Sequence, residues 1–347
     1  MGVAMNSRAI VHRTLDYEQP ERLARSFGDS DFVWTGHSVK THATKWKEVG
    51  GGRWERIDEW GNLWGRVDAT SKGEVAKGVL QSVDDIAGYE FPDFSDAADY
   101  EGVAKARSEA ADRWLIGGVP GFAFNIARKL FRLEDYLVFL LTDLDALHGL
   151  HDRIDVLVQD MIRNYAAGGV DSIMFPEDWG TQDALMINPG LWREEFFPRF
   201  RANCDLAREL GIRVFMHSCG QTEEIVPGLM EAGVSLLQFD QPELHGIDNL
   251  ASHQERGRMT FWCPVDIQKT LQTRDEERIR SAAREMVDKL WQGRGGFVAG
   301  YYGDNASIGL EPSWQEIACD EFLKSGVPER YQRAEAKACV QCPLGSV

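Results

Sequence analysis

The residues most suited to chemistry are His217 and Cys219, which flank Ser218 directly after an apolar segment. Side chains two residues apart on an extended segment point the same way, so this imidazole and this thiolate can bind one ion. Zinc takes nitrogen and sulfur ligands, and a catalytic zinc site uses three protein ligands and leaves one position open. The spacing therefore indicates two ligands of a catalytic zinc site. In the alternative, His217 hydrogen-bonds a carboxylate and Cys219 is a small buried side chain.

The third ligand of such a site must come from another part of the chain. Cys263 directly follows the strand-like segment 259–262, and we expect it to be the third ligand. Glu177 and Asp304, which also follow expected strands, are the alternatives.

Further polar side chains follow the expected strands at the points where these end. The predicted acids or bases are Glu177, Asp178 and Asp240. The predicted substrate-binding residues are Trp179, Gln182, Asp266, Tyr301, Tyr302 and Asp304. In a βα barrel the residues just beyond the strand ends point into one shared mouth, which is why we expect these side chains to form a site. Each carboxylate could instead cap the helix that follows it, and each tyrosine could serve packing alone.

The elements that must position these residues alternate between short apolar runs and amphipathic stretches, which is typical of βα units. The expected strands are 32–35, 114–117, 172–175, 213–216, 235–239, 259–262 and 296–299. The expected helices are 7–15 with Ser7 as its N-cap, 191–209, 222–232, 275–292 and 312–325. We expect His148, His151 and His245, which fall on helix or loop patterns, to face solvent.

Repeated βα units favour an α/β fold, and no GxGxxG motif follows the first strand to indicate a dinucleotide site. We therefore predict one (β/α)8 barrel domain over residues 1–347. Residues 1–110 form a helix and a Trp-rich, β-rich elaboration, residues 111–330 the main βα units, and residues 331–347 a polar tail.

Composition excludes several classes of protein. The 43% hydrophobic residues suffice for a large core, and the net charge of −17 argues against nucleic-acid binding, which needs basic surface. Apolar runs are too short to span a bilayer, and we expect a cytoplasmic protein. In that reducing compartment the six cysteines are expected to be free thiols. We expect four of them to be bystanders, namely Cys204, Cys319, Cys339 and Cys342.

Several motifs together resemble the uroporphyrinogen decarboxylase-like superfamily, which includes that decarboxylase and the methyltransferases of corrinoid-dependent pathways. The matching segments, in chain order, are 5–8, 18–22, 58–64 (DEWGNLW), 177–182 (EDWGTQ), 188–189, 214–220 (VFMHSCG), 231–234, 261–268 and 295–297. The resemblance covers almost the whole chain, and it implies a TIM barrel with its site at the C-terminal mouth.

The resemblance separates two chemistries. The decarboxylase uses no metal and binds its polyanionic substrate through an Arg-rich N-terminal segment, which we do not find here. The methyltransferase branch carries zinc on an HxC motif, matched by His217 and Cys219, and on a distant Cys in a PGC turn. The corresponding segment 300–304 has no Cys, so Cys263 is the replacement that we predict.

We therefore predict a zinc-dependent methyltransferase that moves a methyl group between a small methylated substrate or thiol and a corrinoid. No DxHxxG pattern occurs, so we expect the corrinoid on a partner protein, and the resemblance suggests a homodimer. The alternatives are a metal-independent carboxy-lyase of the decarboxylase type and a ligand-binding barrel without catalysis.

Overall fold

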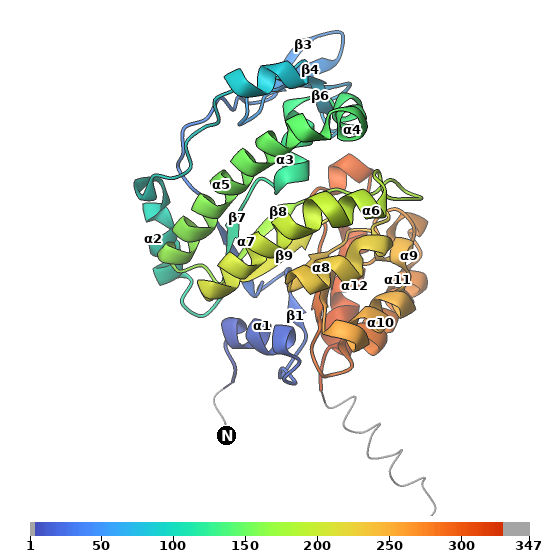
Figure 1. Cartoon of the computed structure of the whole chain (residues 1–347). Coiled ribbons are helices and arrows are strands. Elements are labelled where there is room, and N and C mark those ends of the chain that lie inside the picture. Colours follow the sequence, from blue (N-terminus) through green and yellow to red (C-terminus); the bar gives the residue numbers. More distant parts are fainter. Residues whose placement is uncertain (1–3, 329–347) are drawn as a thin grey trace, which may run out of the picture. The chain divides into compact units, whose positions relative to one another are not determined.

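A computed structural model describes residues 4–328 of the chain. It contains an eight-stranded sheet with the order β1-β12-β11-β10-β9-β8-β7-β2, together with helices between the strands, and a separate four-stranded sheet with the order β3-β4-β5-β6 (Figure 1). This architecture confirms the predicted α/β fold of the (β/α)8 type. Within the described residues, no helix has both the length and the apolar composition needed to cross a bilayer.

The strands are β1 (Ala24–Arg25), β2 (Phe32–Thr35), β3 (Lys47–Gly50), β4 (Arg53–Ile57), β5 (Leu63–Arg66), β6 (Glu74–Lys77), β7 (Trp114–Gly118), β8 (Ser172–Pro176), β9 (Arg213–His217), β10 (Leu236–Gln238), β11 (Thr260–Cys263) and β12 (Phe297–Ala299). The α-helices are α1 (Ser7–Asp16), α2 (Glu101–Glu109), α3 (Ala123–Leu130), α4 (Leu133–Thr142), α5 (Leu144–Gly168), α6 (Pro189–Leu191), α7 (Phe197–Glu209), α8 (Val226–Ala232), α9 (Pro242–His245), α10 (Ile247–Gly257), α11 (Glu276–Met286) and α12 (Pro312–Ser325). In the part of the chain that the structure describes, η3 (Trp192–Phe196) and η6 (Val287–Trp291) are π-helical turns.

The described chain forms two compact units. We call residues 34–111 and 115–234 the site unit, and residues 4–33, 112–114 and 235–328 the terminal unit. In the site unit β8 pairs in parallel with both β7 and β9. Helix α5 contacts β8, helix α7 contacts β9, and the two helices run alongside each other (Figure 1). In the terminal unit β11 pairs in parallel with β10 and β12, and β12 pairs with β1. The prediction of a single domain stays a prediction.

The four antiparallel strands β3–β6 form the Trp-rich elaboration. Asp58, which is buried between β4 and β5, accepts hydrogen bonds from the backbone N–H groups of Trp60 and Asn62 and from the indole of Trp64. Gly61 has a φ of +92°, a conformation that side chains with a Cβ rarely adopt. The DEWGNLW segment is therefore a turn whose buried carboxylate satisfies its own backbone.

The expected strands all occur, within two residues at each end. The expected helix 7–15 also occurs, but its N-cap is Asn6 and not Ser7, because the Asn6 side chain accepts the backbone N–H of Ala9 at 2.9 Å. The segment 191–209 is helical, with the π-helical turn η3 before α7. The long helix α5, which buries one apolar face and is capped by Gly169 after its last residue, Gly168, was not predicted.

The turn η3 brings Glu195 into a buried polar network. Its carboxylate accepts Nδ1 of His151 at 2.7 Å and Nε of Arg199 at 2.8 Å, and it pairs with Nε2 of His148 at 2.8 Å. The other ring nitrogen of His151 hydrogen-bonds the hydroxyl of Tyr136. The expectation that His151 faces solvent was wrong, because this histidine is fully buried.

His245 is also buried, at 6% exposure, so the same expectation was wrong for it too. Its ring stacks on Phe239 with the centroids 4.1 Å apart. An imidazole that packs on an aromatic ring contributes to the core, and its position in a short helix gave no sign of this.

We predict that Glu195→Ala lowers the free energy of unfolding by about 3 kcal/mol, because it leaves His151 and Arg199 without their shared carboxylate. Urea unfolding followed by circular dichroism measures this change. The matched control is Glu194→Ala, which removes an exposed carboxylate next to it and is expected to change stability by about 0.5 kcal/mol at most. Equal effects of the two substitutions would contradict a stabilising role for the network.

Candidate metal centre

The register of β8 and β9 determines which residues meet beyond their ends. Pro176, the last residue of β8, lies opposite His217, the last residue of β9, and the backbone N–H of Glu177 donates to the carbonyl of His217 at 2.8 Å. Because parallel strands keep their register, the residues two positions further along, Asp178 and Cys219, also lie side by side. The backbone N–H of Cys219 donates to Oδ1 of Asp178 at 2.9 Å.

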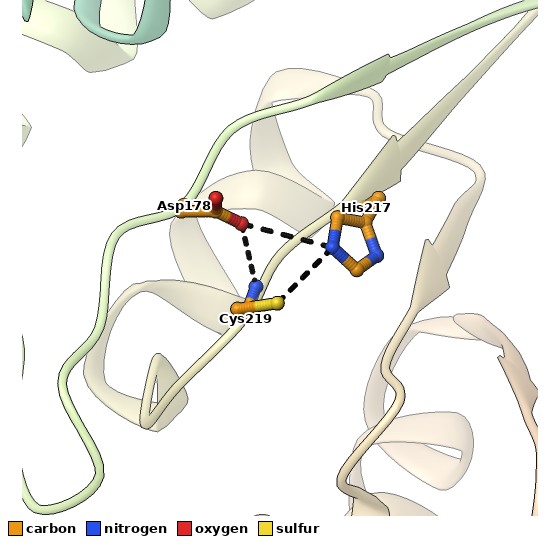
Figure 2. A group of neighbouring side chains, drawn as sticks. All are labelled: Asp178, His217 and Cys219. Carbon is orange, nitrogen blue, oxygen red and sulfur yellow. Dashed lines mark hydrogen bonds and ion pairs between the residues drawn. The ribbon is translucent and has the colours of Figure 1, made fainter. Parts of the chain in front are cut away.

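Asp178, His217 and Cys219 form a cluster of three potential metal ligands, whose ligand atoms all lie within 4.8 Å of one another. Figure 2 shows the carboxylate, one imidazole nitrogen and the sulfur turned toward one another. Nε2 of His217 is 3.3 Å from Sγ of Cys219 and 3.7 Å from Oδ1 of Asp178.

These separations fit a zinc ion. Zinc bonds of about 2.0–2.3 Å in a tetrahedral arrangement place neighbouring ligand atoms roughly 3.3–3.8 Å apart. The donor set of one imidazole, one thiolate and one carboxylate also consists of groups that zinc takes. Cys219 is exposed, so this side of the cluster is open to a small ligand.

Two glycines allow the loops that carry the cluster to approach each other. A Cβ on Gly180 would meet the backbone of Gln221, and a Cβ on Gly220 would meet the carbonyl of Gly180. Gly220 also has a φ of +76°. The backbone N–H of Gln221 donates to the carbonyl of Thr181 at 2.7 Å, which joins the loops. Gly180 and Gly220 are therefore required here, because a side chain at either position would clash with the facing loop.

The charge of Asp178 is controlled by its surroundings. Burial alone would raise its pKa, but His217, Arg128 and the N–H of Cys219 together hold the pKa below its ordinary value. Arg128 donates from Nη2 to Oδ2 of Asp178 at 3.2 Å, while Oδ1 faces His217 and Cys219. Asp178 is thus held as a carboxylate with one oxygen turned toward His217 and Cys219.

Glu177, in contrast, points away from the cluster. It is fully buried, its Oε2 accepts the backbone N–H of Phe122 at 2.8 Å, and its Oε1 accepts that of Asn125 at 3.0 Å. These N–H groups belong to the N-terminus of α3, where an acceptor satisfies donors that have no partner within the helix. Burial raises the pKa of Glu177 to about 7, although the two N–H groups oppose the change. The side chain fixes α3 to the end of β8.

Trp179 and Gln182, the predicted substrate-binding residues of this loop, lie in different surroundings. The ring of Trp179 is fully buried and stacks on Phe124, with the centroids 4.1 Å apart. Gln182 is exposed. Substrate contact by these residues stays a prediction.

Residues 67–301 match the sequence profile of the family described as uroporphyrinogen decarboxylase (URO-D). The chain belongs to this family. No curated protein matches the sequence. Among solved structures, a methyltransferase from Methanosarcina mazei has 15% sequence identity and a TM-score of 0.50; the alignment covers 64% of this chain and 62% of that protein. A D-psicose 3-epimerase crystallised in the presence of D-fructose has 13% identity and a TM-score of 0.41, with 70% of this chain and 88% of that one covered.

The chain thus spans about three-fifths of the length of that methyltransferase. At 15% identity this likeness shows a shared fold. It agrees with the sheet and helices described above.

Cys263, the third ligand predicted from the sequence, ends β11 in the terminal unit. It is fully buried, and this burial raises the pKa of its thiol. Asp266, also buried, accepts backbone N–H groups of Gln268 and Lys269 at 2.9 and 2.8 Å. Asp240 accepts the side-chain amide of Gln238 at 2.7 Å. The roles of these residues in ligand binding or catalysis stay predictions.

The remaining predicted substrate-binding residues, Tyr301, Tyr302 and Asp304, follow β12. The hydroxyl of Tyr301 accepts a hydrogen bond from Asn305, and the hydroxyl of Tyr302 hydrogen-bonds Ser307. Asp304 caps the turn at Ser307. These contacts shape the loop itself, and substrate binding by the three residues stays a prediction. Cys339 and Cys342 lie outside the described residues.

Arg128 is the site residue that sequence reasoning missed. It lies on α3, 50 residues before Asp178. The βα pattern that follows β7 predicts a helix at this place, so a search of that helix for cations could have found Arg128.

We predict that Glu177→Gln changes how stability depends on pH. For Glu177 the unfolded chain loses its proton near pH 4.5, whereas the folded protein keeps it up to about pH 7. Between these values the unfolded state binds fewer protons, so the contribution of Glu177 to the free energy of unfolding falls as the pH rises, by roughly 3 kcal/mol in all. The glutamine variant should lack this fall in urea unfolding between pH 4.5 and 7.

The control for this measurement is Glu194→Gln, an exposed glutamate that should leave the wild-type slope unchanged. All variants are measured with a chelator present, so that metal binding does not contribute. A glutamine variant with the wild-type slope would show that Glu177 is already ionised in the folded protein at low pH.

Proposed function

We propose that this protein is a zinc-dependent methyltransferase, which moves a methyl group between a small methylated substrate or thiol and a corrinoid carried by a partner protein. The observation that carries this proposal is the cluster of Asp178, His217 and Cys219, with separations of 3.3 and 3.7 Å that suit a zinc ion. Membership in the URO-D family and the fold shared with a methyltransferase support it. The proposal includes the cytoplasmic location and the homodimer that we expected from the sequence.

The residues of the chain have distinct roles in this proposal. His217 and Cys219 hold the ion from the end of β9, and Asp178 provides an oxygen from the loop after β8. The low pKa of Asp178 suits it to bind as a carboxylate, not to donate a proton. A zinc ion held here acts as a Lewis acid, which lowers the pKa of a bound thiol or polarises a methylated heteroatom.

Glu177 has a different part in the proposal. Both of its oxygens accept backbone N–H groups, so it serves to fix α3 and is less suited to proton transfer than the sequence suggested. The adjacent carboxylate, that of Asp178, is instead turned toward His217 and Cys219 (Figure 2).

The proposal is tested by metal content and by methyl transfer. The purified protein should contain about one zinc per chain by elemental analysis, and His217→Ala and Cys219→Ala should each lose it. With zinc, the protein should accelerate the reaction of methylcob(III)alamin with a small thiol, which is followed by the visible spectrum of the corrinoid. Both substitutions should abolish the acceleration.

Cys319→Ser is the control, because Cys319 lies on α12 and is not a member of the cluster. A purified wild-type protein that neither contains nor binds zinc would refute the proposal. Release of carbon dioxide from a tetrapyrrole acid without metal would favour the decarboxylase alternative. Ligand binding without turnover of any substrate would favour a non-catalytic barrel.

A cobalt-substituted protein identifies the third ligand. The intensity of the thiolate-to-cobalt absorption band reports how many sulfur atoms bind the ion. If Asp178 is the third ligand, the band corresponds to one thiolate, Asp178→Asn weakens cobalt binding, and Cys263→Ser leaves the band unchanged. If Cys263 is the third ligand, the band corresponds to two thiolates and Cys263→Ser halves it. We predict the first result, because Asp178 lies in the described cluster.

A further inference from the structure

The guanidinium of Arg128 is held in one orientation by its neighbours. Its Nε donates to Oδ1 of Asn125 at 2.9 Å, and its Nη2 donates to Oδ2 of Asp178 at 3.2 Å. Its charged carbon lies 6.0 Å from the ring centroid of Phe124, and the side chain is 18% exposed. An arginine with two directed hydrogen bonds and an aromatic contact has little freedom to leave its partner.

The helix that carries Arg128 is fixed to the same segment as Asp178. Glu177, directly before Asp178, accepts the backbone N–H groups of Phe122 and Asn125 at the start of α3. Asn125 therefore makes two contacts, since its backbone binds Glu177 and its side chain binds Arg128. The segment after β8 and the helix α3 are joined twice, once through each of two adjacent carboxylates.

This arrangement divides the two oxygens of Asp178 between different partners. Oδ2 faces Arg128, whereas Oδ1 faces the N–H of Cys219 and, at 3.7 Å, Nε2 of His217. A carboxylate can bind a metal through one oxygen or through both. An oxygen that accepts a charged N–H group is less available to a metal, so this division favours binding through Oδ1 alone.

We propose that Arg128 is a positioning residue that makes Asp178 a one-oxygen ligand and so keeps one coordination position open for substrate. This inference rests on the proposed function. A carboxylate bound through both oxygens would fill the position that a catalytic site leaves open. Arg128 acts through Asp178 and does not itself contact the ion or the substrate.

The test uses full-length protein loaded with cobalt, whose visible absorption distinguishes four-coordinate from higher-coordinate ions. Wild type should show the intense bands of a four-coordinate ion, and 2-mercaptoethanol, the probe, should bind to it. In Arg128→Met the carboxylate is free to turn, so the bands should weaken toward those of a five-coordinate ion. The affinity for 2-mercaptoethanol should fall about ten-fold, as when a group that orients a metal ligand is lost.

Two further variants make the result specific. Arg132→Met removes an exposed arginine at the start of α4 that pairs with Glu134, and it should leave the spectrum and the affinity unchanged. Arg128→Lys keeps a positive charge that can hold Oδ2, and it should restore much of the four-coordinate spectrum. If Arg128→Met does not fold, Arg128→Lys is compared with Arg128→Gln, which lacks the charge. Equal spectra and equal affinities for 2-mercaptoethanol in these two variants would overturn a role that depends on the charge.

The outcomes for this inference and for the proposed function are distinct. If wild type binds no cobalt, the proposed function fails and the inference falls with it. If wild type binds cobalt but Arg128→Met has the same spectrum and the same affinity for 2-mercaptoethanol, the inference alone is overturned. Thermal unfolding of each variant, followed by circular dichroism, shows whether a change in spectrum comes from loss of the fold.

Discussion

The buried carboxylate of Glu177 is the interaction on which the candidate site depends. It lies between the end of β8 and the N-terminus of α3, and it satisfies two backbone donors that have no partner within the helix. Burying a carboxylate costs free energy unless it is hydrogen-bonded, and the raised pKa of Glu177 reflects this cost. What the structure gains is a fixed distance between two elements that come 50 residues apart in the chain and carry Arg128 and Asp178.

The contact of Glu177 with α3 influences the cluster through a short series of further contacts. α3 positions Arg128, Arg128 holds one oxygen of Asp178, and the other oxygen accepts the N–H of Cys219. The register of β8 and β9 independently brings Asp178 next to His217 and Cys219. The site thus depends on the N-terminus of α3, whose backbone N–H groups bind the carboxylate of Glu177, and on the backbone pairing of β8 with β9.

Sequence reasoning could predict the strands and the residues at their ends, because alternation of apolar runs and amphipathic stretches is a local signal. His217 and Cys219 were recognised in this way. Asp178 was predicted as an acid or base, but not as a ligand, because the direction of its carboxylate depends on Arg128, which lies 50 residues earlier in the chain and is not a local neighbour. Burial of His151 escaped prediction for a similar reason, since its partner Glu195 lies on a π-helical turn that no sequence pattern marked.

The charged groups around the cluster determine which ligands it can bind. In the proposed function, Asp178 and Cys219 would bind a divalent cation as carboxylate and thiolate and balance its charge, and His217 would bind it as a neutral imidazole. A thiol substrate that bound as thiolate would add a further negative charge to this cluster, where it would be repelled by the two already present. Arg128 lies on the far side of Asp178, 18% exposed, and supplies the compensating positive charge without occupying the open side at Cys219. The ion pair between Arg128 and Asp178 offsets the negative charge that the carboxylate adds to the cluster, so it favours the binding of an anionic ligand in the proposed function.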